Sequence, residues 1–499
     1  MANDLMLAVD VGTGSVRAAL VDRRGTIVAF DQHTHEQIIP RFGWAEQRAA
    51  DWWQGTTVAV RGVLEKVPGA VSRVAGVAVC GQMNGTVLLD DDGRLTRETV
   101  PLWNDKRAQD LVVAFREKHP TGAYLALTGN PPAPAWPGLK LQWFQLHEEE
   151  TYRKTTTVLT PKDYVNYRLT GVRAFDLTEA SLSFMMDVRT CDWSPTMLDL
   201  LGVDRRKLPR ISRPTEILGT VTAEAERETS LLAGTPVVAS ASDFPVALLG
   251  SGACWPGRGS DVTGTSSILT IVAEKPLLHP EISNTATPNG LWGGFVLVDA
   301  GGDSVRWARR AFHDNGVDFD TMVTWAAQAP PGADGLFFLP FLSGERLGAH
   351  PNSRAQFFGL TASHGAPHLH RAILEGVAFA LRRHIGVMEK VGGRLERLMA
   401  SGGGAKTKLW LKIKASMYGT PVVVPREPEC GVIGCAAIVW TALGDHPSPQ
   451  AAADALVQFE EEIAPDPVWQ ERYDAMFPIF DRLYLQGQAF YDDLDRLAL

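Results

Sequence analysis

The chain opens with a run of apolar residues, which a glycine turn interrupts and a second apolar run continues. Leu5 to Val11 is almost wholly apolar, Gly12 to Ser15 supplies the turn, and Val16 to Val21 is apolar again. A second turn at Gly25 leads into Thr26 to Phe30, which is also β-prone. Short apolar runs separated by glycine turns are typical of strands. The opening of the chain is therefore expected to form three antiparallel strands.

Helical and strand-like patterns alternate farther along the chain. Ala49 to Lys66 has its apolar residues at the spacing of an amphipathic helix, whereas Val74 to Val79 is the continuous apolar run of a buried strand. Leu409 to Tyr418 is compatible with another helix. This alternation predicts an α/β fold.

One short segment returns in the second half of the chain. Asp10 to Ser15 reads DVGTGS, and Asp261 to Ser267 reads DVTGTSS before another apolar run. The echo indicates two halves that begin alike, although a match this short also arises by chance. Glycine and proline interrupt the pattern near residues 245 to 256. We therefore expect two domains, residues 1–247 and 248–499.

Composition narrows the class of protein. The 499 residues exceed the usual size of one domain, and 48 Lys plus Arg against 57 Asp plus Glu give a net charge of −9. No basic face is indicated, which argues against a nucleic-acid partner. Five cysteines without a CxxC pair favour a reducing cytoplasm over a disulfide framework or a zinc cluster. The longest nearly apolar run, Gly431 to Gly444, is too short to span a bilayer, so no membrane partner is expected.

The two echoing glycine turns are candidates for phosphate binding. A hairpin tip made of Thr13, Gly14 and Ser15 exposes backbone N–H groups and hydroxyls, which are the donors that phosphate oxygens need. Any tight turn has a similar composition, so a purely structural turn remains open. Gly402 to Gly404 is a further candidate, because a backbone without Cβ atoms lets a flat base or sugar lie against it. Neither a GxxxxGK[ST] loop nor a GxGxxG before a helix occurs.

Two aspartates stand out. Asp10 ends an apolar strand beside the first glycine tip, where a carboxylate could hold Mg²⁺ through water, or could simply form the turn. Asp243 lies between a small-residue strand and the apolar segment Phe244 to Gly250. Burial there would raise its pKa toward the range of a general base, whereas the alternative is a helix N-cap.

Two loops after apolar strands carry amide, carboxylate and aromatic groups suited to a polyol. They are Gln82 to Gly85 and Trp103 to Arg107, and each could also be an ordinary loop. The histidines show no metal-ligand spacing, and His368 and His370 are expected on a helix surface.

Taken together, these segments resemble the FGGY family of carbohydrate kinases, and within it the kinases that act on xylulose. The most specific stretch is Ala355 to Leu360 followed after seven residues by His368 to Glu375, which fits the family's C-terminal signature. Pro137 to Trp143 nearly meets the N-terminal signature. The resemblance implies an α/β fold with two actin-like, ribonuclease-H-like ATPase domains and a cleft between them. It also implies ATP, Mg²⁺ and a sugar as ligands, and relatives of this kind are commonly homodimers.

The resemblance also implies roles for individual residues. Asp243 matches the catalytic base, and Asp10 matches the acidic residue near Mg²⁺ and the transferring phosphate. The nucleotide-binding positions are Thr13, Gly14, Ser15 and Arg17 in the first phosphate loop, Gly264, Thr265 and Ser266 in the second, and Gly302, Gly403, Gly404 and Lys408 around the nucleotide. The sugar-binding positions are Met83, Asn84, Trp103, Asp105 and Phe244.

Two departures from the resembling kinases concern the sugar. Those kinases usually carry His in place of Asn84 and Asn in place of Phe244, so both changes alter polar contacts to the substrate. A site that lacks a partner for a hydroxyl discriminates against the substrate that bears it. The hypotheses are therefore a D-xylulose kinase, a kinase for another ketose or polyol such as a tetrose, or a non-catalytic sugar-responsive regulator. The intact aspartates and glycine loops argue against the regulator.

Overall fold

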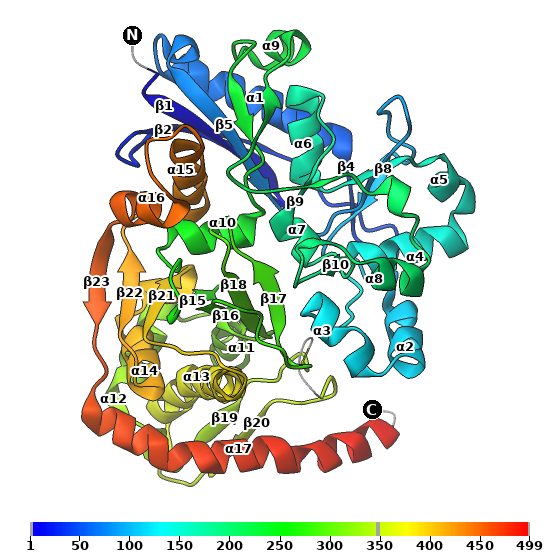
Figure 1. Cartoon of the computed structure of the whole chain (residues 1–499). Helices are drawn as coiled ribbons and strands as arrows, with labels where there is room; N and C mark the ends of the chain where they lie inside the picture. Colours follow the sequence, from blue (N-terminus) through cyan, green and yellow to red (C-terminus); the bar gives the residue numbers. More distant parts are fainter. Residues whose placement is uncertain (1–2, 346–349, 498–499) are drawn as a thin grey trace.

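Two large β-sheets, one above the other in Figure 1, organise the structure, a computed structural model that describes residues 3–345 and 350–497. The first sheet has the strand order β13-β14-β5-β1-β2-β3, and the second has the order β17-β18-β16-β15-β21-β22-β23. The strands of the first sheet are β1 (Leu5–Val11), β2 (Ser15–Asp22), β3 (Ile27–Thr34), β5 (Val74–Gly81), β13 (Ile217–Thr220) and β14 (Pro236–Val238). Those of the second are β15 (Arg258–Thr263), β16 (Ser267–Ala273), β17 (Ser283–Ala286), β18 (Trp292–Val298), β21 (Arg397–Ser401), β22 (Val422–Pro425) and β23 (Phe459–Ile463).

The two sheets share one construction. Strands β1, β2 and β3 are antiparallel neighbours, as the apolar pattern predicts, and β1 also pairs in parallel with β5. In the second sheet β15 and β16 form the corresponding antiparallel hairpin, and β15 pairs in parallel with β21. The short echo in the sequence therefore marks a repeated structural unit.

Both faces of strand β1 are covered. Leu5, Leu7 and Val9 point into a core shared with helix α1 (Ala49–Lys66), whereas Met6 and Ala8 point into a second core on the other face. A strand buried on both faces needs apolar residues at every position rather than at alternate ones. This explains the uninterrupted apolar run at the start of the chain.

Helices cover the sheets on both sides. Helix α1 packs on β2 and β3, and α6 packs on β5. The second sheet is covered mainly by α13, α14 and α17, whose side chains share one core with β16, β18 and β21. The helices used below are α4 (Pro137–His147), α6 (Pro161–Thr170), α7 (Leu177–Ser181), α10 (Asp243–Gly250), α11 (Gly302–His313), α12 (Phe319–Gln328), α13 (Ala366–Lys390), α14 (Lys408–Tyr418), α15 (Cys430–Ala442), α16 (Pro449–Leu456) and α17 (Pro467–Arg496).

Helix α15 comes late in the chain but packs on the first sheet. It contacts β1 and β5, and Figure 1 shows α15 and α16 beside these early strands. Small side chains such as Ala8, Ala78 and Cys80 line that face of the sheet and allow the helix to approach. The division into residues 1–247 and 248–499 remains a proposal, and it falls inside helix α10, which packs against α15. Within the described parts of the chain, every helix is too short or too polar to cross a lipid bilayer.

Candidate active site

The first glycine loop joins β1 to β2, and hydrogen bonds within the turn and from neighbouring side chains hold it in place. The Gly12 N–H donates to the Ser15 carbonyl at 3.0 Å and closes the turn. Gln47 donates to the Thr13 carbonyl at 2.5 Å, and His35 Nε2 lies 3.1 Å from the Gly12 carbonyl. A Cβ atom at Gly14 would meet nothing within 4 Å, so the tip faces open space. The tip is therefore fixed in position and accessible, and the sequence did not single out Gln47 and His35 as its supports.

Asp10 and Arg17 face each other across this hairpin. They are register partners on β1 and β2, and Arg17 Nη2 forms an ion pair with Asp10 Oδ2. Arg17 Nη1 also reaches Glu429, at the start of α15, at 3.1 Å. Burial raises the pKa of Asp10 despite the neighbouring guanidinium. Asp10 Oδ1 is buried and has no hydrogen-bond partner among the described residues, so one acceptor of the carboxylate remains available.

Asp243 is the first residue of helix α10. Ser242 takes the N-cap position instead, and Asp243 Oδ1 accepts a hydrogen bond from the Phe244 N–H at 2.7 Å. Burial raises the pKa of Asp243 to about 7, and the negative charge of Asp10 contributes to the rise. The fold thus brings the end of β1 and the start of α10 close enough for their carboxylates to interact. A carboxylate of this pKa is suited to accept a proton near neutral pH.

The raised pKa of Asp243 carries a cost in stability. The folded protein holds the proton up to about pH 7, whereas the unfolded chain releases it near 3.8, so the free energy of unfolding falls as the pH rises between these values. Asp243→Asn removes this penalty and should raise the free energy of unfolding at about pH 8 by up to about 4 kcal/mol, roughly three pKa units at about 1.4 kcal/mol each. Thermal denaturation of both proteins checks this. The gain should shrink toward pH 4, and an unchanged or lower melting temperature at pH 8 would contradict it.

The second glycine loop and two further glycine segments meet at the end of β15. The Gly302 N–H donates to the Gly264 carbonyl at 3.0 Å, and the Asp303 N–H donates to the Thr265 carbonyl at 3.0 Å. A Cβ atom at Gly302 would lie 2.2 Å from the Gly264 carbonyl oxygen, and one at Gly404 would lie 2.6 Å from Thr263 Cβ. Only glycine permits these approaches. The predicted residues Gly264, Thr265, Ser266, Gly302, Gly403 and Gly404 therefore belong to one backbone cluster.

A buried ion pair supports this cluster. Lys414 Nζ lies 2.6 Å from Asp261 Oδ2 and 2.8 Å from Thr263 Oγ1, and both charged side chains are almost fully buried. Asp261 is the counterpart of Asp10 in the sequence echo, and each aspartate pairs with a basic side chain, Asp261 with Lys414 and Asp10 with Arg17. The sequence does not single out Lys414, because Lys412 lies two residues before it in the same helix and is partly exposed, paired with Asp466.

The two predicted sugar loops lie next to the first glycine loop. Trp103 Nε1 donates to Thr13 Oγ1 at 3.2 Å. Asn84 adopts a left-handed backbone conformation with φ of 62°, and its Oδ1 is buried without a hydrogen-bond partner among the described residues. Met83 is buried beside it. The structure therefore joins the Trp103 loop to the first glycine loop, and it leaves Asn84 Oδ1 without a hydrogen bond from the described residues.

Three of the predicted ligand-binding residues, Asp105, Phe244 and Lys408, also have protein partners. Asp105 is fully buried, and its two oxygens accept hydrogen bonds from Arg107 and from the Ala45 N–H at 2.7 to 2.9 Å. These hydrogen bonds shape the loop that carries Trp103, and a contact of Asp105 with sugar stays a prediction. The Phe244 ring packs edge-on against Phe295 of β18, with ring centroids 5.2 Å apart.

Lys408 is the third case. Its ammonium group pairs with Glu461 of β23 at 3.0 Å, and 79% of its side chain is exposed. Lys408 is the first residue of helix α14, which follows the glycine cluster. Its ammonium group nevertheless forms a surface ion pair and does not point toward the cluster in this arrangement.

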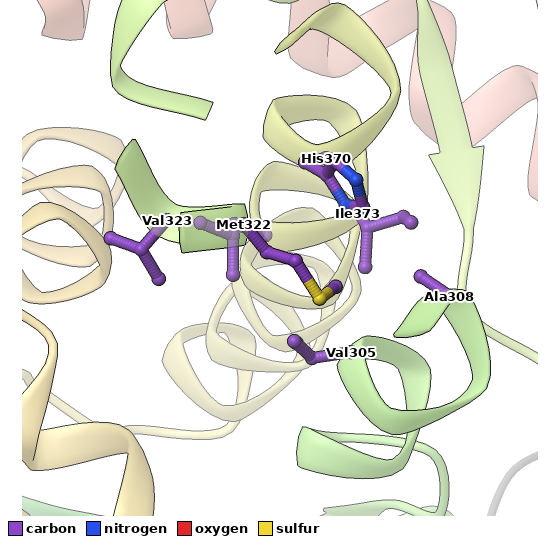
Figure 2. A pocket seen from close by; sticks show the side chains of 7 residues that line it. Val305, Ala308, Met322, Val323, His370 and Ile373 are labelled. Carbon is purple, nitrogen blue, oxygen red and sulfur yellow. The ribbon is translucent and has the colours of Figure 1, made fainter. Parts of the chain in front are cut away.

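A separate crevice lies between helices α11, α12 and α13 (Figure 2). Val305, Met322 and Ile373 line it, and His370 is its polar side chain. His370 is only 4% exposed and lies 2.8 Å from His313, and burial lowers its pKa to about 4, so it is neutral at physiological pH. The expectation that His370 lies on a helix surface is wrong. A crevice with this lining lacks the donors that a triphosphate needs.

Comparison with known proteins places the chain in a family. The profile of the N-terminal domain of the FGGY family of carbohydrate kinases matches residues 5–250, and the profile of the C-terminal domain matches residues 260–443. The chain is 30% identical over 487 residues to a xylulose kinase of Escherichia coli, covering 97% of this chain and 99% of that one. It is also 27% identical over 491 residues to a gluconokinase of Bacillus subtilis, covering 96% and 95% of the two chains.

The fold agrees with these matches. The crystal structure of a xylulose kinase from Rhodospirillum rubrum superposes with a TM-score of 0.93 at 29% identity, covering 98% of this chain and all of that one. The expected pair of actin-like ATPase domains is thereby confirmed. Two family profiles that span most of the sequence and a shared fold over its whole length show that the chain belongs to the FGGY family of carbohydrate kinases and is an ATP-dependent sugar kinase.

Proposed function

We propose that the protein transfers the γ-phosphoryl group of ATP to the terminal hydroxyl of a ketopentose, with D-xylulose as the substrate and D-xylulose 5-phosphate as the product. The observation that carries the proposal is Asp243, a carboxyl group with a pKa of about 7 beside Asp10 and the first phosphate loop. The similarity to xylulose kinases over nearly the whole chain supports the choice of sugar.

In the proposed mechanism Asp243 accepts the proton of the attacking hydroxyl. The oxygen then attacks the γ-phosphorus in line, and the leaving ADP stays bound at the glycine cluster. Backbone N–H groups of the two hairpin loops, at Thr13 to Ser15 and Gly264 to Ser266, stabilise the charge on the phosphoryl oxygens. Water is the competing nucleophile, and closure of the two domains over the ligands would exclude it. Slow hydrolysis of ATP without sugar is therefore expected.

Asp10 suits the magnesium ion that such kinases use. Its Oδ1 is buried and has no hydrogen-bond partner among the described residues, and Mg²⁺ prefers carboxylate oxygens together with water and substrate phosphates. Asp10 would hold the ion, through water, and Mg²⁺ when bound neutralises charge on the phosphates. Arg17 keeps the carboxylate oriented through the ion pair with its other oxygen.

The second candidate is a kinase for a shorter or less hydroxylated ketose or polyol. Phe244 favours it, because an aromatic ring packed on Phe295 directly after the proposed base cannot hydrogen-bond a sugar hydroxyl. Phe244→Asn should raise kcat/KM for D-xylulose relative to a tetrulose by about tenfold, since a recovered polar contact restores recognition of the additional hydroxyl. Paired assays of the two sugars check this. An unchanged ratio would show that Phe244 does not select the substrate.

Release of ADP from ATP, measured with a panel of sugars, tests the proposed substrate. The panel contains D-xylulose, other ketopentoses, tetruloses, pentitols and gluconate at matched concentrations, with ATP alone as the blank. We expect the highest kcat/KM with D-xylulose. A higher value with a tetrulose, a polyol or gluconate would replace the substrate but keep the reaction, and a signal equal to the blank with every sugar would contradict the proposed chemistry.

A further inference from the structure

The short helix α7 connects two parts of the candidate site. It spans Leu177–Ser181, and Asp176 caps it by accepting hydrogen bonds from the Thr178 and Glu179 N–H groups at 3.1 and 3.2 Å. Asp176, Thr178 and Glu179 are fully buried. Polar side chains occur in such surroundings only when they hold specific partners. The partners of Thr178 and Glu179 lie on two different segments of the site.

Thr178 forms hydrogen bonds with Ser242, the residue that precedes Asp243. Its hydroxyl donates to Asp176 Oδ2 at 2.5 Å and receives the Ser242 N–H at 3.0 Å, and the two hydroxyl oxygens of Thr178 and Ser242 lie 2.8 Å apart. The hydroxyl group of Thr178 therefore uses its one proton and both of its lone pairs in hydrogen bonds. Because Ser242 is the N-cap of α10, its position fixes where the helix starts and where the Asp243 carboxylate points.

Lys162 anchors the same segment from the other end. Its Nζ donates to the Ala239 carbonyl at 3.0 Å and to Asp163 Oδ1 at 2.7 Å, and lies 3.6 Å from Asp176 Oδ2. Ser240, between these anchors, has a φ of 59° in the left-handed region, which costs energy for a residue other than glycine. The segment from Ala239 to Ser242 is thus held in a strained shape by buried hydrogen bonds at both ends.

Glu179 forms a hydrogen bond with the predicted sugar loop at Asn84. Its Oε2 accepts a hydrogen bond from the Asn84 N–H at 3.0 Å. On the other side of the same residue, Lys140 Nζ donates to the Asn84 carbonyl at 2.9 Å and to the Leu102 carbonyl, directly before Trp103, at 2.5 Å. The side chains of Glu179 and Lys140 are both fully buried. These bonds fix the left-handed backbone of Asn84 and the separation of the two sugar loops.

We infer that Thr178 and Glu179 are positioning residues, which hold the base Asp243 and the sugar loop at Asn84 at a set distance through two adjacent positions of helix α7. The inference rests on the proposed role of Asp243. Neither residue needs to touch the substrate. Thr178 acts on the catalytic step through Ser242, and Glu179 acts on sugar binding through Asn84.

The two positions should therefore affect different kinetic constants. Thr178→Val keeps the shape but leaves the Ser242 N–H and Asp176 without their partner, so kcat should fall by about 30-fold while the KM for ATP stays within twofold. Thr178→Ser keeps the hydroxyl and should restore at least about half of kcat. Glu179→Met should raise the KM for the sugar by about tenfold, and Glu179→Gln, which keeps an acceptor, should stay close to the unmodified protein.

Thr229→Val is the matched control. Thr229 is fully buried in helix α9 (Ala223–Thr229), and its hydroxyl donates to the Ala225 carbonyl at 2.7 Å. Figure 1 shows α9 at the top of the view, away from the second sheet. Its substitution should lower thermal stability without changing kcat or the KM for sugar by more than twofold. Ser242→Ala, a smaller change in the same hydrogen-bond chain, should lower kcat three- to tenfold and serves if Thr178→Val does not fold.

The outcomes separate this inference from the proposed function. If Asp243→Asn is inactive while Thr178→Val or Ser242→Ala keeps the kcat of the unmodified protein, the inference is overturned and the function stands. An equal loss of kcat in Thr229→Val, or a lack of rescue by Thr178→Ser, would also overturn it. If Asp243→Asn keeps substantial turnover, the proposed function itself fails.

Discussion

Replacing Asp243 by Asn should lower kcat for sugar phosphorylation by roughly a thousandfold. The amide keeps the size of the side chain and the hydrogen bond from the Phe244 N–H, but it cannot accept a proton from the attacking hydroxyl. Burial and the nearby charge of Asp10 raise the pKa of the natural carboxyl to about 7, and this basicity is what the substitution removes. Coupled detection of ADP at saturating ATP and sugar measures the loss.

Binding of ATP provides the internal control for this variant. The glycine loops and the Asp261–Lys414 pair hold the proposed nucleotide site without Asp243, so the Kd for ATP should change by less than about threefold. A variant that keeps more than a tenth of the original kcat would show that another group, or no group, accepts the proton.

Gly434→Ala is expected to disrupt the packing of α10 on α15. A Cβ atom at Gly434 would lie 2.0 Å from the Val246 carbonyl oxygen, and one at Gly250 would lie 1.8 Å from the Cys430 carbonyl oxygen. The two helices therefore cross with their backbones in contact. Adding one methyl group should lower the free energy of unfolding by about 3 kcal/mol. Chemical denaturation measures this loss.

The Gly434→Ala variant should also lose kinase activity, because α10 and α15 position residues of the candidate site. Helix α10 begins at Asp243, and α15 begins beside Glu429, the partner of Arg17, so separating the helices displaces both ends of the catalytic arrangement. Gly386→Ala is the matched control, because Gly386 lies in helix α13 and its added Cβ would meet nothing within 4 Å. That change should stabilise the protein by about 0.5 to 1 kcal/mol. Equal behaviour of the two variants would contradict the close-contact explanation.

The sequence predicts the local elements well because their signals are local. The strand β1, with both faces buried, appears as an unbroken apolar run, and α1 spans the predicted Ala49 to Lys66. The echo between Asp10 and Asp261 correctly indicates two similar hairpins. Both glycine loops that are proposed to bind phosphate could be located, because their turns require glycine at fixed positions in the sequence.

Long-range contacts explain what the sequence could not show. Asp105 accepts hydrogen bonds from Arg107, two residues away, and from the Ala45 amide, which only the fold brings close to it. The contact of Phe244 with Phe295, on the second sheet, is likewise created only by the fold. The start of helix α7 could be predicted from the sequence, because Asp176 three residues before Glu179 matches the pattern of a helix N-terminus. Its functional contacts, however, come from residues far away in the sequence.

The dependence of phosphoryl transfer on pH tests most directly whether Asp243 acts as the base. The rate constant of a single turnover should be measured by rapid quench with saturating ATP and D-xylulose from about pH 5.5 to 8.5. The carboxyl must lose its proton before it can accept one, so the rate constant should rise tenfold per pH unit up to about 7 and then level off. A rate constant that does not change across this range would contradict the central role given to Asp243.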